Sequence, residues 1–428
     1  MAGNHIMKKR YLDVDVVTAA RDRFKQMFHD YDKLVFNFSG GKDSLAMVYL
    51  GLEVAKEIGK TPIEVVYVDH EIEGLETLSL IEQVGAMDGV NFIRYAMPFA
   101  LRNACSFHAP KWYPWHPDEQ DLWVREKPAD AVTELPGCEF HCDPDYEHVD
   151  GLPFKALGVT KSPSFQDILT RHIEKYLNTG HTAISMIGLR AEESLARYCV
   201  MTRKAKECYL STNTQGAYPL YDWTAYDVWR YIRDTGLPYN KEYDLMNKGA
   251  NYNKLKKQRV GSIFGEESLR GLDEWQTFYQ GFWHQILERA EGVKTAWRYA
   301  NDGIYTGTKV EKAPDMTWAA YLSQILTRQS KEHKAMSMKQ IRYVISWHEK
   351  RTREDITDLE KDANPLTGIS WEFLCKIAIR GDSKERNRQK IPTLAKAARQ
   401  RAGITRDESV RKYGRPEYVR EYFAKKTA

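Results

Sequence analysis

Six consecutive residues constrain this chain more than any other feature of its sequence: Ser39, Gly40, Gly41, Lys42, Asp43 and Ser44. The apolar stretch before them, residues 34–38, is typical of a buried strand, and the stretch after them, residues 45–50, is typical of a helix. Glycines at such a junction let backbone N–H groups approach an anion closely, and the helix N-terminus adds partial positive charge. The sequence therefore predicts a phosphate-binding loop.

The polar side chains of this run agree with that interpretation. The hydroxyls of Ser39 and Ser44 can donate to phosphate oxygens, and Lys42 adds a point charge. The run is not a Walker A loop, because that motif places Ser or Thr directly after its lysine, whereas Asp43 follows Lys42 here. The alternative is a glycine turn without a ligand, which the complete run between strand and helix disfavours.

Apolar runs alternate with helical patterns along the first half of the chain. We expect strands at 34–38, 63–68, 91–96 and 182–187, and helices at 11–33, from 45 onward and at 76–85. Such alternation predicts an α/β fold with a doubly wound, mostly parallel sheet. Ligands bind outside the carboxyl ends of such strands, so residues 39–44, Asp69 and residues 188–190 are expected to converge on one crevice.

With 428 residues, the chain is long enough for two domains. Residues 1–10 are expected to be a tail that includes a cloning remnant, with Met7 as the native start. A nucleotide-binding domain is expected over 11–264, with a Trp-, His- and Cys-rich insertion at 98–165, and a helical basic domain over 265–428. No apolar run is long enough to span a bilayer and no secretory signal is recognisable, so we expect a cytoplasmic protein without a membrane partner.

The positive charge is concentrated at the end of the chain. The net charge of the whole sequence is +4, yet from Lys331 onward 24 Lys and Arg stand against 14 Asp and Glu. This surplus is either a solvated helix face, which we favour, or a surface for the phosphate backbone of a nucleic acid.

A second motif runs from Gly188 to Arg197. Arg190 comes just after the strand expected at 182–187, and Arg197 lies seven residues further on. Two guanidinium groups can grip a polyphosphate or a sulfate, since each binds such anions bidentately. Glu192 is expected to orient Arg197 or to hold a magnesium ion. The alternative is a helix N-terminus with surface Glu–Arg pairs.

Two further carboxylates are candidates for nucleotide contacts. Asp69 ends the strand at 63–68, where a carboxylate meets a ribose hydroxyl or a magnesium ion, or caps a helix. Asp222 lies in the segment 218–224, close to Thr224, which is expected to cap a helix.

The order of these motifs carries a family resemblance. The glycine loop, the segment 188–197 and the block 218–240 occur in this order in phosphoadenosine phosphosulfate (PAPS) reductase-like proteins, and the chain resembles them over about residues 30–250. This resemblance implies a nucleotide alpha-hydrolase fold that binds ATP or PAPS. It makes residues 39–44 the phosphate loop and Asp69, Arg190 and Arg197 flanking nucleotide contacts.

The remainder, with the segments 112–126 and 259–266, resembles the IbrA-type branch of that family. Proteins of that branch are described as co-activators of prophage gene expression and are usually encoded beside a ParB-like partner. The resemblance thus implies a protein partner of that kind.

The cysteines depart from the pattern of a true sulfonucleotide reductase, which attacks the sulfate with a cysteine thiolate. No cysteine follows Cys375, which falls on an apolar helix face and is expected in a core. Paired cysteines are missing, so no iron–sulfur cluster is expected. Zinc binding by Cys138, His141 and Cys142 is one interpretation of the remaining cluster, and buried free thiols are the favoured one.

Together these observations favour an enzyme that transfers an adenylyl group. A substrate oxygen would attack the α-phosphate of ATP and pyrophosphate would leave, with Lys42, Arg190 and Arg197 stabilising the negative charge. Asp43 or Asp69 would hold Mg²⁺. Two alternatives stay open: a nucleotide-sensing or nucleic-acid-associated subunit without turnover, and reduction of PAPS.

Overall fold

The computed structural model describes residues 12–106, 109–141, 148–149, 152–153, 161–194, 197–198, 201, 210, 215–248, 260–265, 268–299, 312–380 and 386–427. The chain forms two compact units, and each is described by itself. The first comprises residues 1–103, 112–142 and 161–294, and the second residues 104–111, 143–160 and 295–428. The boundary between the two compact units thus falls between residues 294 and 295 of the sequence. The expected domain boundary between residues 264 and 265 stays a prediction.

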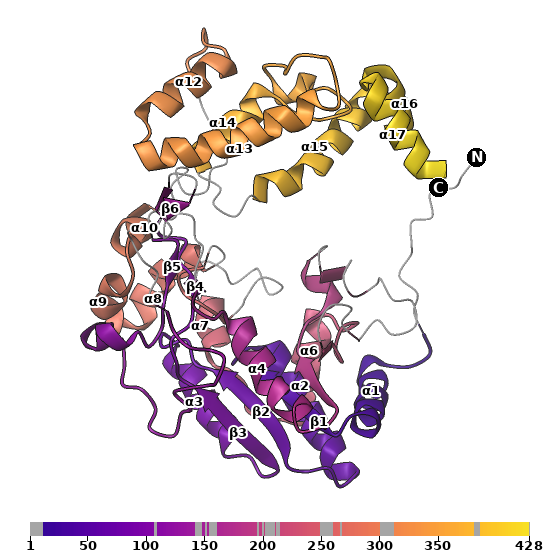
Figure 1. Ribbon diagram of the computed structural model, residues 1–428. Coiled ribbons are helices and arrows are strands. Elements are labelled where there is room, and N and C mark those ends of the chain that lie inside the picture. Colours follow the sequence, from indigo (N-terminus) through magenta and orange to yellow (C-terminus); the bar gives the residue numbers. More distant parts are fainter. Residues whose placement is uncertain are drawn as a thin grey trace. The chain divides into compact units, whose positions relative to one another are not determined.

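A five-stranded sheet of order β3-β2-β1-β8-β9 forms the centre of the first unit (Figure 1). Its strands are β1 (Lys33–Phe38), β2 (Ile63–Val68), β3 (Val90–Tyr95), β8 (Ala183–Ile187) and β9 (Gly216–Ala217). Every pairing is parallel, and Val35 of β1 lies opposite Glu64 of β2 and Ser185 of β8. Along the chain, β2 and β3 are added on one side of β1, and β8 and β9 are added on its other side. The direction of strand addition therefore reverses at β1. Such a reversal is where open α/β sheets bind ligands.

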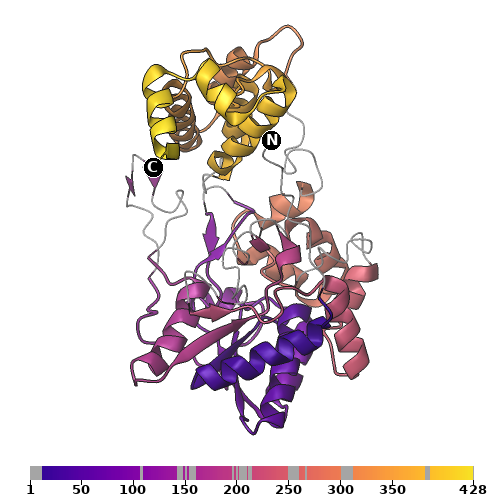
Figure 2. The ribbon, with the colours of Figure 1, turned by 90° about the vertical axis from the view of Figure 1, so that its right-hand side faces the viewer.

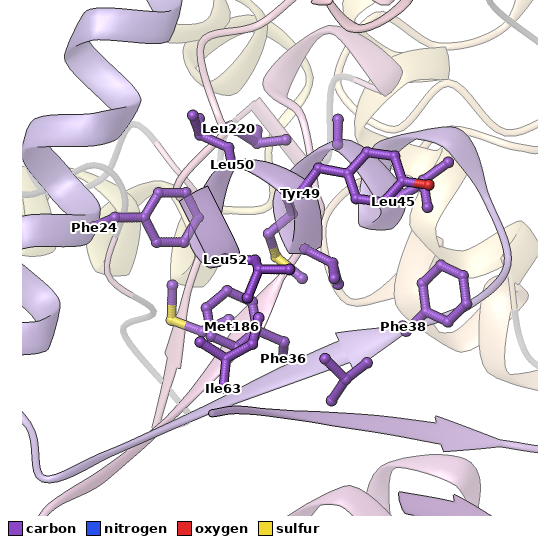
Figure 3. Packing of buried hydrophobic residues seen from close by; sticks show 14 of the residues in the cluster. Phe24, Phe36, Phe38, Leu45, Tyr49, Leu50, Leu52, Ile63, Met186 and Leu220 are labelled. Atoms are coloured by element: carbon purple, nitrogen blue, oxygen red, sulfur yellow. The ribbon is translucent and has the colours of Figure 1, made fainter. Parts of the chain in front are cut away.

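Alternating side chains place an apolar layer on each face of this sheet. Phe36 and Phe38 of β1 face a cluster that includes α1 (Val16–Asp30), α2 (Lys42–Glu57), α3 (Leu75–Gly85) and α6 (Ala225–Thr235). Figure 3 shows Phe36 and Phe24 of α1 in this layer. Their ring centres are 5.9 Å apart. Val35 points the other way, into a cluster with α4 (Phe165–Leu177). Helices therefore cover both faces, and the predicted doubly wound α/β fold is confirmed.

The element boundaries follow from local capping. The helix expected at 11–33 is shorter, because Asp15 caps α1 by accepting hydrogen bonds from the N–H groups of Val17 and Thr18. Thr224 caps α6 as predicted, in a reciprocal pair with Asp227. The strand expected at 63–68 has those bounds in the structure.

Short elements occupy the described parts of the insertion at 98–165. They are β4 (Leu101–Arg102), β5 (Lys111–Trp112), the 3-10 turn η1 (Pro117–Leu122), and the antiparallel pair β6 (His148–Val149) and β7 (Leu152–Pro153). Trp112 and Trp115 are buried. The first unit continues through η3 (Ala191–Glu193), α7 (Glu242–Lys248), η4 (Leu269–Gly271), α8 (Leu272–Phe278) and α9 (Gln280–Arg289), and α10 (Val293–Tyr299) spans the boundary between the units.

The second unit is helical, and Figure 2 shows its helices in orange to yellow. They are α12 (Trp318–Arg328), α13 (Lys331–Glu349), the 3-10 turn η5 (Glu360–Asp362), α14 (Trp371–Arg380), α15 (Arg386–Ala402), α16 (Arg406–Tyr413) and α17 (Pro416–Thr427). Cys375 is fully buried in their apolar core, as predicted. Within the described ranges, none of the helices combines the length and apolar character needed to cross a bilayer.

Candidate functional site

The predicted phosphate loop joins β1 to α2 at the carboxyl edge of the sheet. Gly40 adopts a φ of +72°, a backbone conformation that side chains disfavour. Gly41 is the N-cap of α2 and provides no side chain to cap it. The first turn of a helix leaves backbone N–H groups without intrahelical partners, so this loop presents the anion-binding end of α2.

The two serines of the loop bond to one another. The hydroxyl oxygens of Ser39 and Ser44 lie 3.0 Å apart, and the N–H of Ser39 donates to the Ser44 hydroxyl at 3.1 Å. The Ser44 hydroxyl donates in turn to the carbonyl of Gly41 at 3.0 Å. These bonds tie the two ends of the loop together and fix its shape.

Two buried cations and one carboxylate sit beside the loop. Lys42 and Arg190 are each only 2% exposed. The Nζ of Lys42 lies 3.4 Å from the carboxylate of Asp43, and Nε of Arg190 donates to that same carboxylate. Because buried charges are costly unless paired, Asp43 is the counter-charge that keeps both cations in place. Arg190 also pairs with Glu192 at 3.2 Å, so an incoming anion would meet two cations that carboxylates already hold in place.

Gly188 allows the end of β8 to approach the loop closely. A Cβ atom at this position would lie 2.8 Å from both N and Cα of Ser44 and 2.9 Å from the carbonyl carbon of Asp43. These are backbone atoms in the first turn of α2. Because Gly188 has no side chain, Arg190, two residues further on, can reach Asp43. This contact agrees with the predicted convergence of the two motifs.

Glu192 and Arg197 lie differently from expectation. Glu192 accepts from Arg190 at 3.2 Å and from the N–H of Ala225 at 2.9 Å, so it orients Arg190. Arg197 is paired with Glu193 instead. Glu193 therefore pairs with Arg197, the role that the sequence suggested for Glu192.

Asp69 ends β2 in a fully buried position. One carboxylate oxygen accepts from Arg125 and from the N–H of Glu71, and the other, Oδ2, has no hydrogen-bond partner among the described residues. The indole of Trp115 donates to its backbone carbonyl at 3.1 Å. The sequence placed Asp69 at a strand end correctly and did not reveal Arg125 as its partner.

Glu71 anchors the Trp-rich insertion to the sheet. It is fully buried with a φ of +68°, and Arg289 of α9 binds both of its carboxylate oxygens, at 2.6 and 2.9 Å. The backbone N–H groups of Trp115 and Val124 donate to the same carboxylate, at 2.8 and 3.2 Å. The guanidinium of Arg125 donates to the Glu71 carbonyl at 2.8 Å. The segment 115–125 of the insertion is therefore fixed beside the end of β2 by a network that sequence reasoning missed.

Burial shifts the pKa values of three groups near this edge. It raises the pKa of Glu73 to about 8, with a further contribution from the charge of Asp69, and it raises the pKa of Glu242 to about 7. Burial also lowers the pKa of His70 to about 4. At neutral pH the histidine is therefore uncharged and Glu73 is mostly protonated.

Asp222 forms an ion pair with Arg23 of α1, at 2.5 and 2.9 Å. Arg23 also donates to the carbonyl of Pro219 at 2.7 Å. The structure thus uses Asp222 to hold the segment before α6 against α1.

The expected metal ligands do not form a ready site. Asp43 and Asp69 are each bonded to an arginine, and among the described residues no group of three His, Cys, Asp or Glu side chains is arranged to hold a metal ion. Cys138 is buried and His141 is exposed, while Cys142 lies outside the described residues. Magnesium and zinc binding stay predictions, as does the expected lack of an iron–sulfur cluster.

Two of the described cysteines are poor nucleophiles. Cys105, Cys138 and Cys375 are all buried. Burial raises the pKa of the Cys138 thiol to about 11 and that of Cys375 to about 12, so both stay protonated at neutral pH. This disfavours attack on sulfate by these two thiols.

Comparison with known proteins agrees with the motif order. Residues 33–122 and 154–261 match the family model of the phosphoadenosine phosphosulfate reductase domain. The uncharacterized protein YbdN of Escherichia coli strain K12 is 26% identical over 418 residues, covering 92% of this chain and 97% of that protein. The uncharacterized protein MJ0066 of Methanocaldococcus jannaschii is 27% identical over 207 residues, covering 48% of this chain and 32% of that protein.

Solved structures align more weakly. The FMN adenylyltransferase of Candida glabrata gives a TM-score of 0.30 at 12% identity, covering 53% of this chain and 57% of that chain. The phosphoadenylyl-sulfate reductase of Candida auris, in a phosphate complex, gives 0.29 at 12% identity, covering 60% and 99%. With scores this low, the fold rests on the strand order and register of the chain itself.

Proposed function

Residues 33–122 and 154–261 carry a domain of the phosphoadenosine phosphosulfate reductase family, and from this premise we propose that the loop 39–44 binds the phosphates of an adenine nucleotide. The main support is the pair of buried cations, Lys42 and Arg190, that share Asp43 beside the N-terminus of α2. Buried charges of this kind are retained only where they are paired, and an anionic ligand would add a further partner for both cations. Arg190 and Glu192 link the cluster to the start of α6.

We further propose that the reaction is adenylyl transfer from ATP. A substrate oxygen attacks the α-phosphorus, the bond from that phosphorus to the bridging oxygen breaks, and pyrophosphate leaves. Lys42 and Arg190, and Arg197 once released from Glu193, stabilise the negative charge that grows on the phosphate oxygens. Asp69, with its unpartnered Oδ2, accepts a hydrogen bond from a ribose hydroxyl.

Pyrophosphate release from radiolabelled ATP tests this proposal. The Lys42→Ala variant is expected to lose most of the release, on the order of a hundredfold, because one removed electrostatic donor costs about that much. Lys56→Ala is the matched control, since Lys56 lies on the same helix in an exposed pair with Asp88. Release that is unaffected by Lys42→Ala would refute the proposal.

A second candidate is a nucleic-acid-associated subunit without turnover, of the IbrA type with a ParB-like partner. Its support is the charge of residues 386–427, which contain 13 Lys and Arg and 4 Asp and Glu. Burial and then the nearby charge of Arg406 lower the pKa of Arg399, so positive groups crowd there. A phosphate backbone would relieve that crowding.

Salt dependence distinguishes this candidate. Binding to a DNA or RNA duplex should weaken steeply with salt, with a logarithmic slope of about −0.9 for each phosphate contact. The slope should become shallower in the double variant Arg406→Gln, Arg411→Gln. A lack of binding at low salt would exclude this candidate. Reduction of PAPS, the third option, would need a thiol other than those of Cys138 and Cys375, whose raised pKa values disfavour it.

A further inference from the structure

We propose that Asn240, in the turn between α6 and α7, is a positioning residue that sets the orientation of the peptide between Gly40 and Gly41. This inference rests on the proposed function, because it concerns how the loop is prepared for phosphate. The side chain of Asn240 is fully buried. It follows the loop by two hundred residues in the sequence, so no local spacing indicated this contact.

All polar atoms of the Asn240 side chain are engaged. Its Nδ2 donates to the carbonyl of Gly40 at 2.9 Å and to the hydroxyl of Thr77 at 2.7 Å. Its Oδ1 accepts from the backbone N–H of Glu242 at 2.9 Å. A backbone N–H can only donate, so this last bond fixes which amide atom is the oxygen and makes Nδ2 the donor to the loop.

This bond determines the direction of a loop amide. The carbonyl and N–H of a trans peptide point to opposite sides of the chain. With the Gly40 carbonyl held by Asn240, the N–H of Gly41 points away from Asn240. Gly40 has a positive φ, and consecutive amides in such conformations form a concave anion-binding surface. Asn240 thus maintains the loop in its anion-binding form before a ligand arrives.

Tyr243, in the first turn of α7, supports the next amide. Its hydroxyl accepts from the N–H of Lys42 at 3.1 Å, and its ring centre lies 5.1 Å from Nζ of Lys42. Burial raises the pKa of Tyr243, so its hydroxyl stays protonated and uncharged. Asn240 and Tyr243 together therefore hold the backbone on both sides of Gly41.

Thr77 closes the network. It accepts from Asn240 and donates to the carboxyl of Glu242. A Cβ atom at Gly40 would lie 2.8 Å from the Thr77 methyl, so the threonine also packs against the loop. Removal of the Asn240 donor would leave the Gly40 carbonyl buried without that bond, and the peptide would be free to rotate.

Two readouts on the full chain test this role: the dissociation constant for inorganic pyrophosphate and the hydrogen exchange of the amides at 39–44. Asn240→Asp keeps the shape of the side chain and removes the donor. We expect pyrophosphate to bind at least tenfold more weakly, and exchange at 39–44 to accelerate while exchange in β2 stays at the wild-type rate. Asn178→Asp, on an exposed residue at the end of α4, is the matched control.

The outcomes separate this inference from the proposed function. Unchanged pyrophosphate binding in Asn240→Asp overturns the inference, and so does exchange that accelerates throughout the sheet, since that marks a general loss of stability. If Asn240→Asp does not fold, Tyr243→Phe decides, with a severalfold weaker binding expected and unchanged binding overturning the inference. If wild-type protein binds neither pyrophosphate nor ATP, the proposed function itself fails. Loss of binding in Lys42→Ala but not in Asn240→Asp leaves the function standing and refutes only the role of Asn240.

Discussion

Substitution of Gly188 by alanine tests whether the close approach of β8 and α2 forms the site. The added Cβ would meet N and Cα of Ser44 at 2.8 Å, whereas ordinary contacts lie at 3.4–4 Å. Both atoms belong to the backbone of a helix, so no flexible side chain can turn aside. The first turn of α2 and the end of β8 must therefore separate by about half an ångström or more.

Both stability and binding should change. Overpacking of this kind costs about 1–3 kcal/mol of unfolding free energy. For a unit of this size that corresponds to a melting temperature lower by roughly 3–10 °C. The same displacement moves Asp43 relative to Arg190, and a shift of this scale in a preorganised site weakens nucleotide affinity by about ten- to a hundredfold.

Thermal unfolding and ATP titration of Gly188→Ala measure these effects. Gly261→Ala is the control, because a Cβ there would meet no atom of the described residues within 4 Å. The control should match wild type within about 0.5 kcal/mol. If Gly188→Ala behaves like the control in both assays, the close approach does not position the site and the geometric argument is refuted.

Two further predictions concern the buried charges. The pKa values of Glu73 and Glu242, about 8 and about 7, exceed the ordinary value of 4.5, so the folded state holds these protons more tightly than the unfolded state. The unfolding free energy should therefore fall as pH rises from 4.5 to 8, by on the order of a few kcal/mol, and Glu73→Gln with Glu242→Gln should flatten this dependence in urea unfolding series. A stability that rises over this range would contradict the assignment. Arg289→Ala leaves Glu71 buried without its cation and should cost about 3–5 kcal/mol in the same assay, whereas a cost below about 1 kcal/mol would show that the insertion is anchored otherwise.

The sequence predicted those parts of the site that depend on neighbouring residues. The β1–loop–α2 unit follows from apolar periodicity, two glycines and the helix after them. The placement of Arg190 beside the loop follows from its position directly after a strand. Parallel strands bring their carboxyl ends to one edge, so local patterns were enough to predict this convergence.

The contacts that sequence reasoning missed join residues far apart in the chain. Arg289 and Glu71 are separated by 218 residues, and Asn240 and Gly40 by 200. No spacing rule indicates such pairs, and the positive φ of Glu71 falls on a residue type that rarely adopts it. A partial signal existed for Asn240, because it ends the Leu-Pro-Tyr-Asn block that carries the family resemblance. Asp222 is the opposite case. It belongs to a motif that predicted a nucleotide contact, and in the structure it forms an ion pair with Arg23 of α1.

A structure of the full chain with a bound adenine nucleotide tests the central claim most directly. We expect the phosphates within hydrogen-bonding distance of the Gly41 backbone N–H and of the Arg190 guanidinium, with Asp43 partly released from its two cations. A nucleotide bound elsewhere in the first unit, with the loop 39–44 unchanged and Arg190 still paired with Asp43, would contradict the account.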